Sequence, residues 1–184
     1  EIEYAYDTLK ADGIALTTNY IDKYPGEEAW AAVFDELNRR KAVVYFHPTA
    51  ASFAFNRVKD IPPPTIEFPF DTTRTITSLL FSGTLSRCPD IKWIFSHAGG
   101  TAPALMQRFA GLFASRKDLQ EKLPNGPAYH MERFVYDTAS ASTRAPIGSP
   151  PGSNAARTAS LAFPFSGAAV TAPARTSGAS RRRA

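Results

Sequence analysis

Two short runs of apolar residues each lead to a histidine, and this arrangement constrains the fold more than any other feature of the sequence. Residues 42–46 (AVVYF) are followed directly by His47, and residues 91–95 (IKWIF) are followed by Ser96 and His97. Strands that are apolar almost throughout are typical of parallel sheets inside a layer of helices. The sequence therefore predicts an α/β fold in which polar side chains follow the carboxyl ends of buried strands, where such folds place their active sites.

Helical and extended patterns alternate along the first 141 residues. The patterns predict helices over 2–12, 27–40, 72–87 and 102–117, and strands over 14–18, 42–46, 91–95 and 134–136. Three prolines at 62–64 predict a loop before the third helix, because proline cannot continue a helix interior, and Asp71 is expected to cap that helix at its N-terminus. The alternation indicates a parallel sheet, in either a barrel or a doubly wound arrangement.

The composition changes near Thr143. Beyond this residue Ala, Ser, Pro, Arg, Thr and Gly dominate, and every Asp, Glu and Lys lies at or before Asp137. A segment of this composition buries too little apolar surface to offset the entropy lost on ordering. We therefore expect a folded domain over residues 1–142 and a disordered, low-complexity tail over residues 143–184.

The net charge of +4 comes from this tail. Six arginines lie beyond Asp137, and without them the first 137 residues carry a formal charge of −2. A basic tail without interleaved aromatic residues does not favour nucleic-acid binding. The chain also has no apolar run of membrane-spanning length, and its single cysteine, Cys88, excludes a disulfide within the chain. We expect a cytoplasmic protein with neither nucleic acid nor a membrane as partner.

The two strand-end histidines are the first candidates for chemistry. A neutral imidazole at the position of His47 can hold a divalent metal, and the alternative is a hydrogen-bonded structural histidine. His97 occupies the equivalent place on the next strand, where Gly99 and Gly100 allow backbone or substrate to approach closely, although such glycines also form ordinary turns. His130 precedes a strand on the opposite side and is expected to be a surface or packing residue. Phosphate-loop, nucleophile-elbow and cysteine-cluster motifs are absent from the sequence.

Two arginines and one further aspartate have open roles. Arg74, beside Asp71, either lines the rim of the site and orients substrate or belongs to an ordinary helix start. Arg108 is either a solvated helix residue or a group that binds a carboxylate substrate. Asp137, at the end of its strand, is a metal ligand, a partner of such a ligand, or a cap of the turn.

Four motifs occur in order along the chain, and together they resemble a known family. They are YFHPT at 45–49, EFPFDTTR at 67–74, SGTL at 82–85 and SHAGG at 96–100. From residue 1 to about residue 141 the chain is similar to the amidohydrolase-2 family, and within it to the branch of aminocarboxymuconate-semialdehyde decarboxylase and 6-methylsalicylate decarboxylase.

The resemblance implies a (β/α)8 barrel of which the chain holds about strands four to seven. It implies that His47 is a ligand of a divalent metal, with Zn²⁺ as the expected ion, and that His97 acts in acid/base catalysis beside it. Arg108 matches an arginine that contacts a substrate carboxylate, in some relatives across a homodimer interface. The implied reaction is the non-oxidative decarboxylation of a small aromatic or unsaturated carboxylic acid.

Parts of the family pattern are missing from this sequence. The resemblance calls for a His-x-His motif on the first strand and an aspartate at the end of the eighth strand, and neither occurs here. We therefore expect the chain to be a fragment, with a shifted reading frame beyond about Thr143. Two alternatives stay open: a metal-dependent hydrolase of a lactone or amide, and a catalytically inactive fragment with fewer than the usual three protein ligands for its metal.

Overall fold

A four-stranded parallel sheet forms the centre of the computed structural model, which describes residues 1–55 and 57–141. The strands are β1 (Ile14–Thr17), β2 (Val43–His47), β3 (Lys92–Phe95) and β4 (Val135–Tyr136), and their order in the sheet equals their order in the sequence. The register pairs Ile14 with Val44, Val44 with Trp93 and Ile94 with Val135. In a doubly wound sheet the order of the strands reverses at a switch point. The order found here runs in one direction only, and this favours the barrel.

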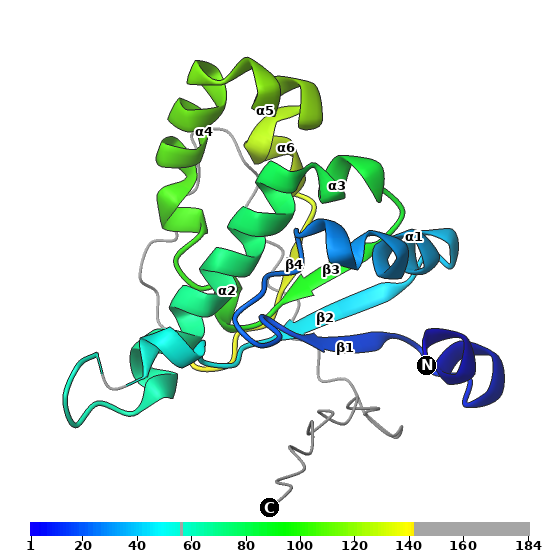
Figure 1. Cartoon of the computed structure of the whole chain (residues 1–184), viewed down its shortest axis with the longest axis horizontal. Coiled ribbons are helices and arrows are strands. Elements are labelled where there is room, and N and C mark those ends of the chain that lie inside the picture. Colours follow the sequence, from blue (N-terminus) through cyan, green and yellow to red (C-terminus); the bar gives the residue numbers. More distant parts are fainter. Residues whose placement is uncertain (56, 142–184) are drawn as a thin grey trace, which may run out of the picture.

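Helices connect the strands and cover one side of the sheet (Figure 1). Those of the first two connections are α1 (Ala31–Arg39), α2 (Pro63–Ser82) and α3 (Thr84–Arg87). The third connection holds α4 (Met106–Ser115), α5 (Lys117–Lys122) and α6 (Gly126–Met131). The described residues also form 3-10 or π-helical turns, which are η1 (Tyr4–Thr8), η2 (Glu28–Trp30), η3 (Ser52–Ala54), η4 (His97–Gly99) and η5 (Pro103–Leu105). Within the described segments, no helix combines the length and the apolar character that crossing a bilayer requires.

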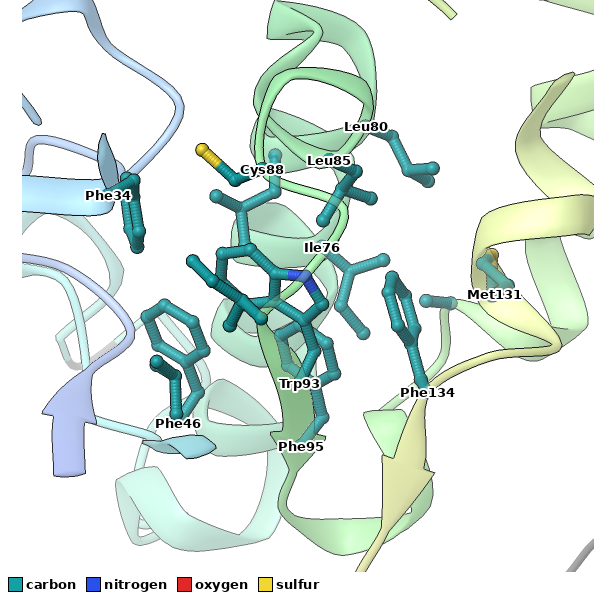
Figure 2. Close-up of a cluster of buried hydrophobic side chains, with 14 of the residues drawn as sticks. Phe34, Phe46, Ile76, Leu80, Leu85, Cys88, Trp93, Phe95, Met131 and Phe134 are labelled. Atoms are coloured by element: carbon teal, nitrogen blue, oxygen red, sulfur yellow. The ribbon is translucent and has the colours of Figure 1, made fainter. Parts of the chain in front are cut away.

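The hydrophobic core lies between the sheet and these helices, and Figure 2 shows its central side chains. In β2, Val44 and Phe46 are fully buried, whereas Val43 and Tyr45, which alternate with them, are only half-buried. Phe46 stacks on Phe95, with ring centroids 5.4 Å apart. Side chains on the helix-facing side of the sheet are therefore fully buried. Among the described residues, those on the opposite side, which is the interior of a barrel, are partly exposed to solvent.

Phe95→Ala should destabilise the fold by about 3–5 kcal/mol, because it empties a fully buried ring site that stacks on Phe46. Urea unfolding followed by circular dichroism measures the change in the free energy of unfolding. Leu112→Ala is the matched control, since Leu112 is 43% exposed and its truncation should cost well under 1 kcal/mol. Equal losses for the two variants would contradict this account of the core.

Helix α2 corrects the prediction for the proline-rich segment. It begins at Pro63 rather than near residue 72, and Pro62 has the extended backbone of a residue that precedes a helix. Proline suits the first turn because the amide that it lacks has no acceptor there. Pro69 lies inside the helix, and the helix stops at Ser82 because Gly83 adopts a φ of 86°.

The prediction that Asp71 caps a helix is therefore wrong. Asp71 lies inside α2 and is fully buried. Other helix boundaries also differ: η1 covers only the middle of the predicted 2–12 helix, and α4 ends at Ser115. The predicted disordered tail over 143–184 lies outside the described residues.

Candidate functional site

His47 and His97 lie side by side at the carboxyl ends of neighbouring strands. His47 is the last residue of β2, and His97 begins the turn that follows β3. Their ring centroids are 6.3 Å apart. The sequence-based expectation that the two side chains share one edge of the sheet is confirmed, while their chemical roles stay predictions.

The surroundings of the two imidazoles differ. His47 is exposed at the rim, whereas His97 is half-buried. Burial lowers the pKa of His97, with the Asp137 charge opposing this effect and the neighbouring His47 adding to it. The Nδ1 atom of His97 is buried and has no hydrogen-bond partner among the described residues. An imidazole at the end of a strand is suited to exchange a proton with a bound molecule near pH 7.

The turn after β3 has an unusual backbone. His97, Ala98, Gly99 and Gly100 all have positive φ values, of 52°, 53°, 77° and 63°. A Cβ atom on Gly100 would lie 2.1 Å from the carbonyl oxygen of Pro69, so glycine is required where this turn packs against α2. The structure shows both uses expected for these glycines, because they form a turn and the backbone of α2 closely approaches Gly100.

Phe68 borders His47, and Arg74 lies further along the same helix. Phe68 in α2 stands edge-on to His47, with ring centroids 6.3 Å apart. The Arg74 guanidinium lies 5.3 Å from the centre of the Phe53 ring, and its Nη1 atom is 3.8 Å from Asp71 Oδ1. This Nη1 atom is buried without a hydrogen-bond partner among the described residues. Arg74 is thus ion-paired with Asp71 and keeps a donor without a hydrogen bond. Among the described residues, no hydrogen bond, ion pair or ring contact joins it to either histidine.

Arg108 lies elsewhere. It is exposed on α4 and lines a surface groove between α2 and α4 together with Thr77, Phe81 and Leu112. No recorded contact joins Arg108 to His47 or His97 in the described part of the chain. The structure thus does not bring this predicted substrate-binding residue into the histidine pair of the same chain.

Asp71 organises a buried polar cluster that the sequence analysis missed. Its carboxylate accepts hydrogen bonds from the Thr18 hydroxyl, from Asn19 Nδ2 at 2.7 Å and from the Tyr24 hydroxyl at 2.6 Å. Burial and the adjacent Asp71 carboxylate raise the pKa of Tyr24. Thr18 and Asn19 directly follow β1, so the rule that located the two histidines could also have singled them out.

Few metal ligands are available in this part of the protein. Among residues 1–55 and 57–141, no three His, Cys, Asp or Glu side chains lie close enough together to hold a metal ion. His47 fits as one ligand because its imidazole is exposed at the strand end. His130 is buried in α6, away from this edge, which agrees with the predicted packing role.

Comparison with known proteins matches residues 1–139 to the family described as Amidohydrolase. The chain is 49% identical over 145 residues to decarboxylase yanB of Aspergillus niger, covering 76% of this chain and 39% of that protein. It is 44% identical over 112 residues to 6-methylsalicylic acid decarboxylase acuB of Aspergillus aculeatus, covering 60% of this chain and 34% of that protein. The chain thus spans well under half the length of these relatives.

A solved structure with the same fold is dihydroxybenzoic acid decarboxylase from Polaromonas sp. JS666, which contains bound manganese and the inhibitor 2-nitroresorcinol. The TM-score is 0.60 at 20% identity, with 74% of this chain and 44% of that chain covered. This likeness confirms that the described residues form part of an α/β barrel.

Proposed function

Because this chain belongs to the amidohydrolase family, we propose that the protein containing it is a metal-dependent, non-oxidative decarboxylase of a small aromatic carboxylic acid. The observation that carries the proposal is the pairing of His47 and His97, whose rings lie 6.3 Å apart at the strand ends. The decarboxylase relatives at 49% and 44% identity support the same reaction class.

In this proposal His97 handles the proton. Loss of CO2 breaks the bond between the carboxylate and a ring carbon and leaves the electron pair on that carbon, which then takes up a proton. A half-buried imidazole with a free Nδ1 can deliver this proton and recover one from solvent. Burial lowers the pKa of His97, which makes its protonated ring a stronger acid.

We also propose that His47 is one ligand of a divalent metal, with Zn²⁺ as the expected ion. The manganese in the Polaromonas decarboxylase supports a divalent metal in this fold. The described residues contain no set of three ligands, so the other ligands would come from elsewhere in the protein. A bound ion of this kind acts as a Lewis acid toward the oxygens of the substrate.

His47→Ala should lower metal affinity at least about 100-fold, since even the loss of a group that only supports a ligand costs about 10- to 100-fold. Calorimetric titration with Zn²⁺ and elemental analysis of the purified protein measure this change. His130→Gln is the control, because it replaces a histidine that packs in α6. Equal metal content in the two variants would show that His47 is not a metal ligand.

Substrate binding is assigned to the two arginines. Arg74 is ion-paired with Asp71 but has a donor without a hydrogen-bond partner among the described residues, which supports contact with a carboxylate. Arg108 is exposed beside a surface groove, and this position supports a role in the site of a second copy in a homodimer. We further propose a cytoplasmic location, supported by the buried and unpaired Cys88, which suits a reducing compartment.

The decisive experiment incubates the protein and a divalent metal with 6-methylsalicylate and related hydroxybenzoates. Release of one CO2 for each decarboxylated ring product is the expected result. Turnover of a lactone or amide without CO2 would favour the hydrolase alternative on the same scaffold. A protein that holds neither metal nor activity would favour the alternative of an inactive fragment.

A further inference from the structure

We propose that Asp137 is a positioning residue that holds the strained turn at His97 and thereby aims the His97 imidazole. This inference rests on the proposed function, in which His97 is the proton carrier. Asp137 directly follows β4, the strand that pairs with β3. It is half-buried.

The Asp137 carboxylate links β2 and the end of β4 to the turn that follows β3. Its Oδ1 atom accepts hydrogen bonds from the backbone amides of His97 at 2.8 Å and Ala139 at 3.0 Å. Its Oδ2 atom accepts a hydrogen bond from the Tyr45 hydroxyl, in β2, at 2.7 Å. Both oxygens are therefore occupied by protein donors, which disfavours the metal-ligand role left open for this residue in the sequence.

The backbone of Asp137 adds two further bonds to the same turn. Its amide donates to the Phe95 carbonyl at 3.1 Å, and its carbonyl accepts from the Ala98 amide at 2.9 Å. The amides of His97 and Ala98 thus both donate hydrogen bonds to Asp137. These two consecutive amides belong to the two residues whose conformation most needs support.

His97 and Ala98 occupy the left-handed region of backbone conformation although both carry a Cβ atom. This conformation is unfavourable for such residues and persists only where surrounding contacts enforce it. The direction of the His97 side chain depends on this backbone. We call the two hydrogen bonds from the His97 and Ala98 amides to Asp137 the clamp. If the clamp were weakened, the turn would relax and the His97 ring would move relative to His47.

Tyr45 extends the clamp across the sheet. It lies two residues before His47 in β2, and its hydroxyl ties that strand to Asp137. The bond sets the end of β2 against the turn that carries His97. We infer that this bond helps to fix the separation of the two imidazoles, so Tyr45→Phe should cause a smaller displacement of His97 than the loss of the carboxylate.

The test compares Asp137→Ala, Asp137→Asn and Tyr45→Phe in the 184-residue chain, with histidine ring resonances and amide exchange measured by NMR. In Asp137→Ala, the His97 amide should exchange about 10- to 100-fold faster, as expected when a hydrogen bond to a charged group is lost. The His97 ring signals should shift or double, while those of His130 stay in place. Tyr45→Phe should shift the His97 ring signals by less and leave the amide bond intact.

Asp90→Asn is the matched control, because Asp90 is an exposed aspartate at the opposite end of β3. It should alter neither the amide exchange nor the ring signals of His97. A purely structural role for Asp137 predicts a lower melting temperature with unchanged His97 ring signals in both Tyr45→Phe and Asp137→Asn. That result would overturn the proposal.

Activity separates this inference from the proposed function. If the protein decarboxylates, Asp137→Asn should lower kcat about 10-fold or more with little change in KM, as expected for a displaced proton carrier. If the unmodified protein has no decarboxylase activity, the proposed function fails, while the amide and ring signals still report on the clamp.

Discussion

His97→Gln should reduce the rate of decarboxylation by about 100- to 10,000-fold, the usual contribution of a positioned acid/base group. Glutamine keeps a polar side chain of similar reach but cannot carry the proton that the ring carbon needs. The loss should therefore appear in kcat more than in KM. Continuous measurement of CO2 release at saturating substrate provides the comparison, in the protein that contains this chain.

The matched control for this substitution is His130→Gln. His130 is buried in α6, and burial lowers its pKa. Among residues 1–55 and 57–141, no hydrogen bond, ion pair or ring contact joins it to the site. Its substitution should leave kcat within about threefold of the unmodified enzyme when measured on folded protein. A His97→Gln variant that retains most of its activity and a full complement of metal would exclude His97 as the proton carrier.

Asp71→Ala should destabilise the fold by about 3–5 kcal/mol, the cost that is typical of breaking a buried, hydrogen-bonded charged group. Asp71 is fully buried and satisfies the Thr18 hydroxyl, the Asn19 amide and the Tyr24 hydroxyl. Alanine removes the acceptor. The Tyr24 hydroxyl then has no partner among the described residues, and the Thr18 hydroxyl and the Asn19 amide keep only the Thr49 carbonyl. Urea unfolding followed by tryptophan fluorescence measures the change in the free energy of unfolding.

Asp71→Asn and Asp118→Ala complete this experiment. Asparagine preserves the shape but directs an amide donor toward groups that also donate, so it should cost about 1–3 kcal/mol. Asp118 forms an exposed ion pair with Arg116, and its replacement should cost less than about 1 kcal/mol. If Asp71→Ala costs no more than Asp118→Ala, then the buried cluster does not stabilise the fold.

Much of the architecture followed from local patterns. The strands were predicted to within about one or two residues, because nearly continuous apolar runs have few alternatives to a buried strand. The meeting of His47 and His97 followed from the geometry of parallel strands, whose carboxyl ends share one edge. These inferences needed only the order of residues along the chain.

The start of α2 could not be found in the same way. Prolines at 62–64 indicate an interruption by local rules, but the first turn of a helix accepts proline. The segment from Pro63 to Phe70 also packs beside the site, where Phe68 meets His47 and the Pro69 carbonyl approaches Gly100. Only tertiary contacts favour a helix there over a loop.

The sequence by itself determined the strands, the two strand-end histidines and the family. Tertiary structure alone decided that Asp71 is a buried acceptor, that Arg108 lies apart from the histidine pair and that Asp137 bonds to the His97 turn. The physical reason is that a polar side chain acquires its role from its hydrogen-bond partners. For Asp71 and Asp137 these partners include residues on other strands or loops, such as Asn19 and Tyr45, which local patterns do not identify.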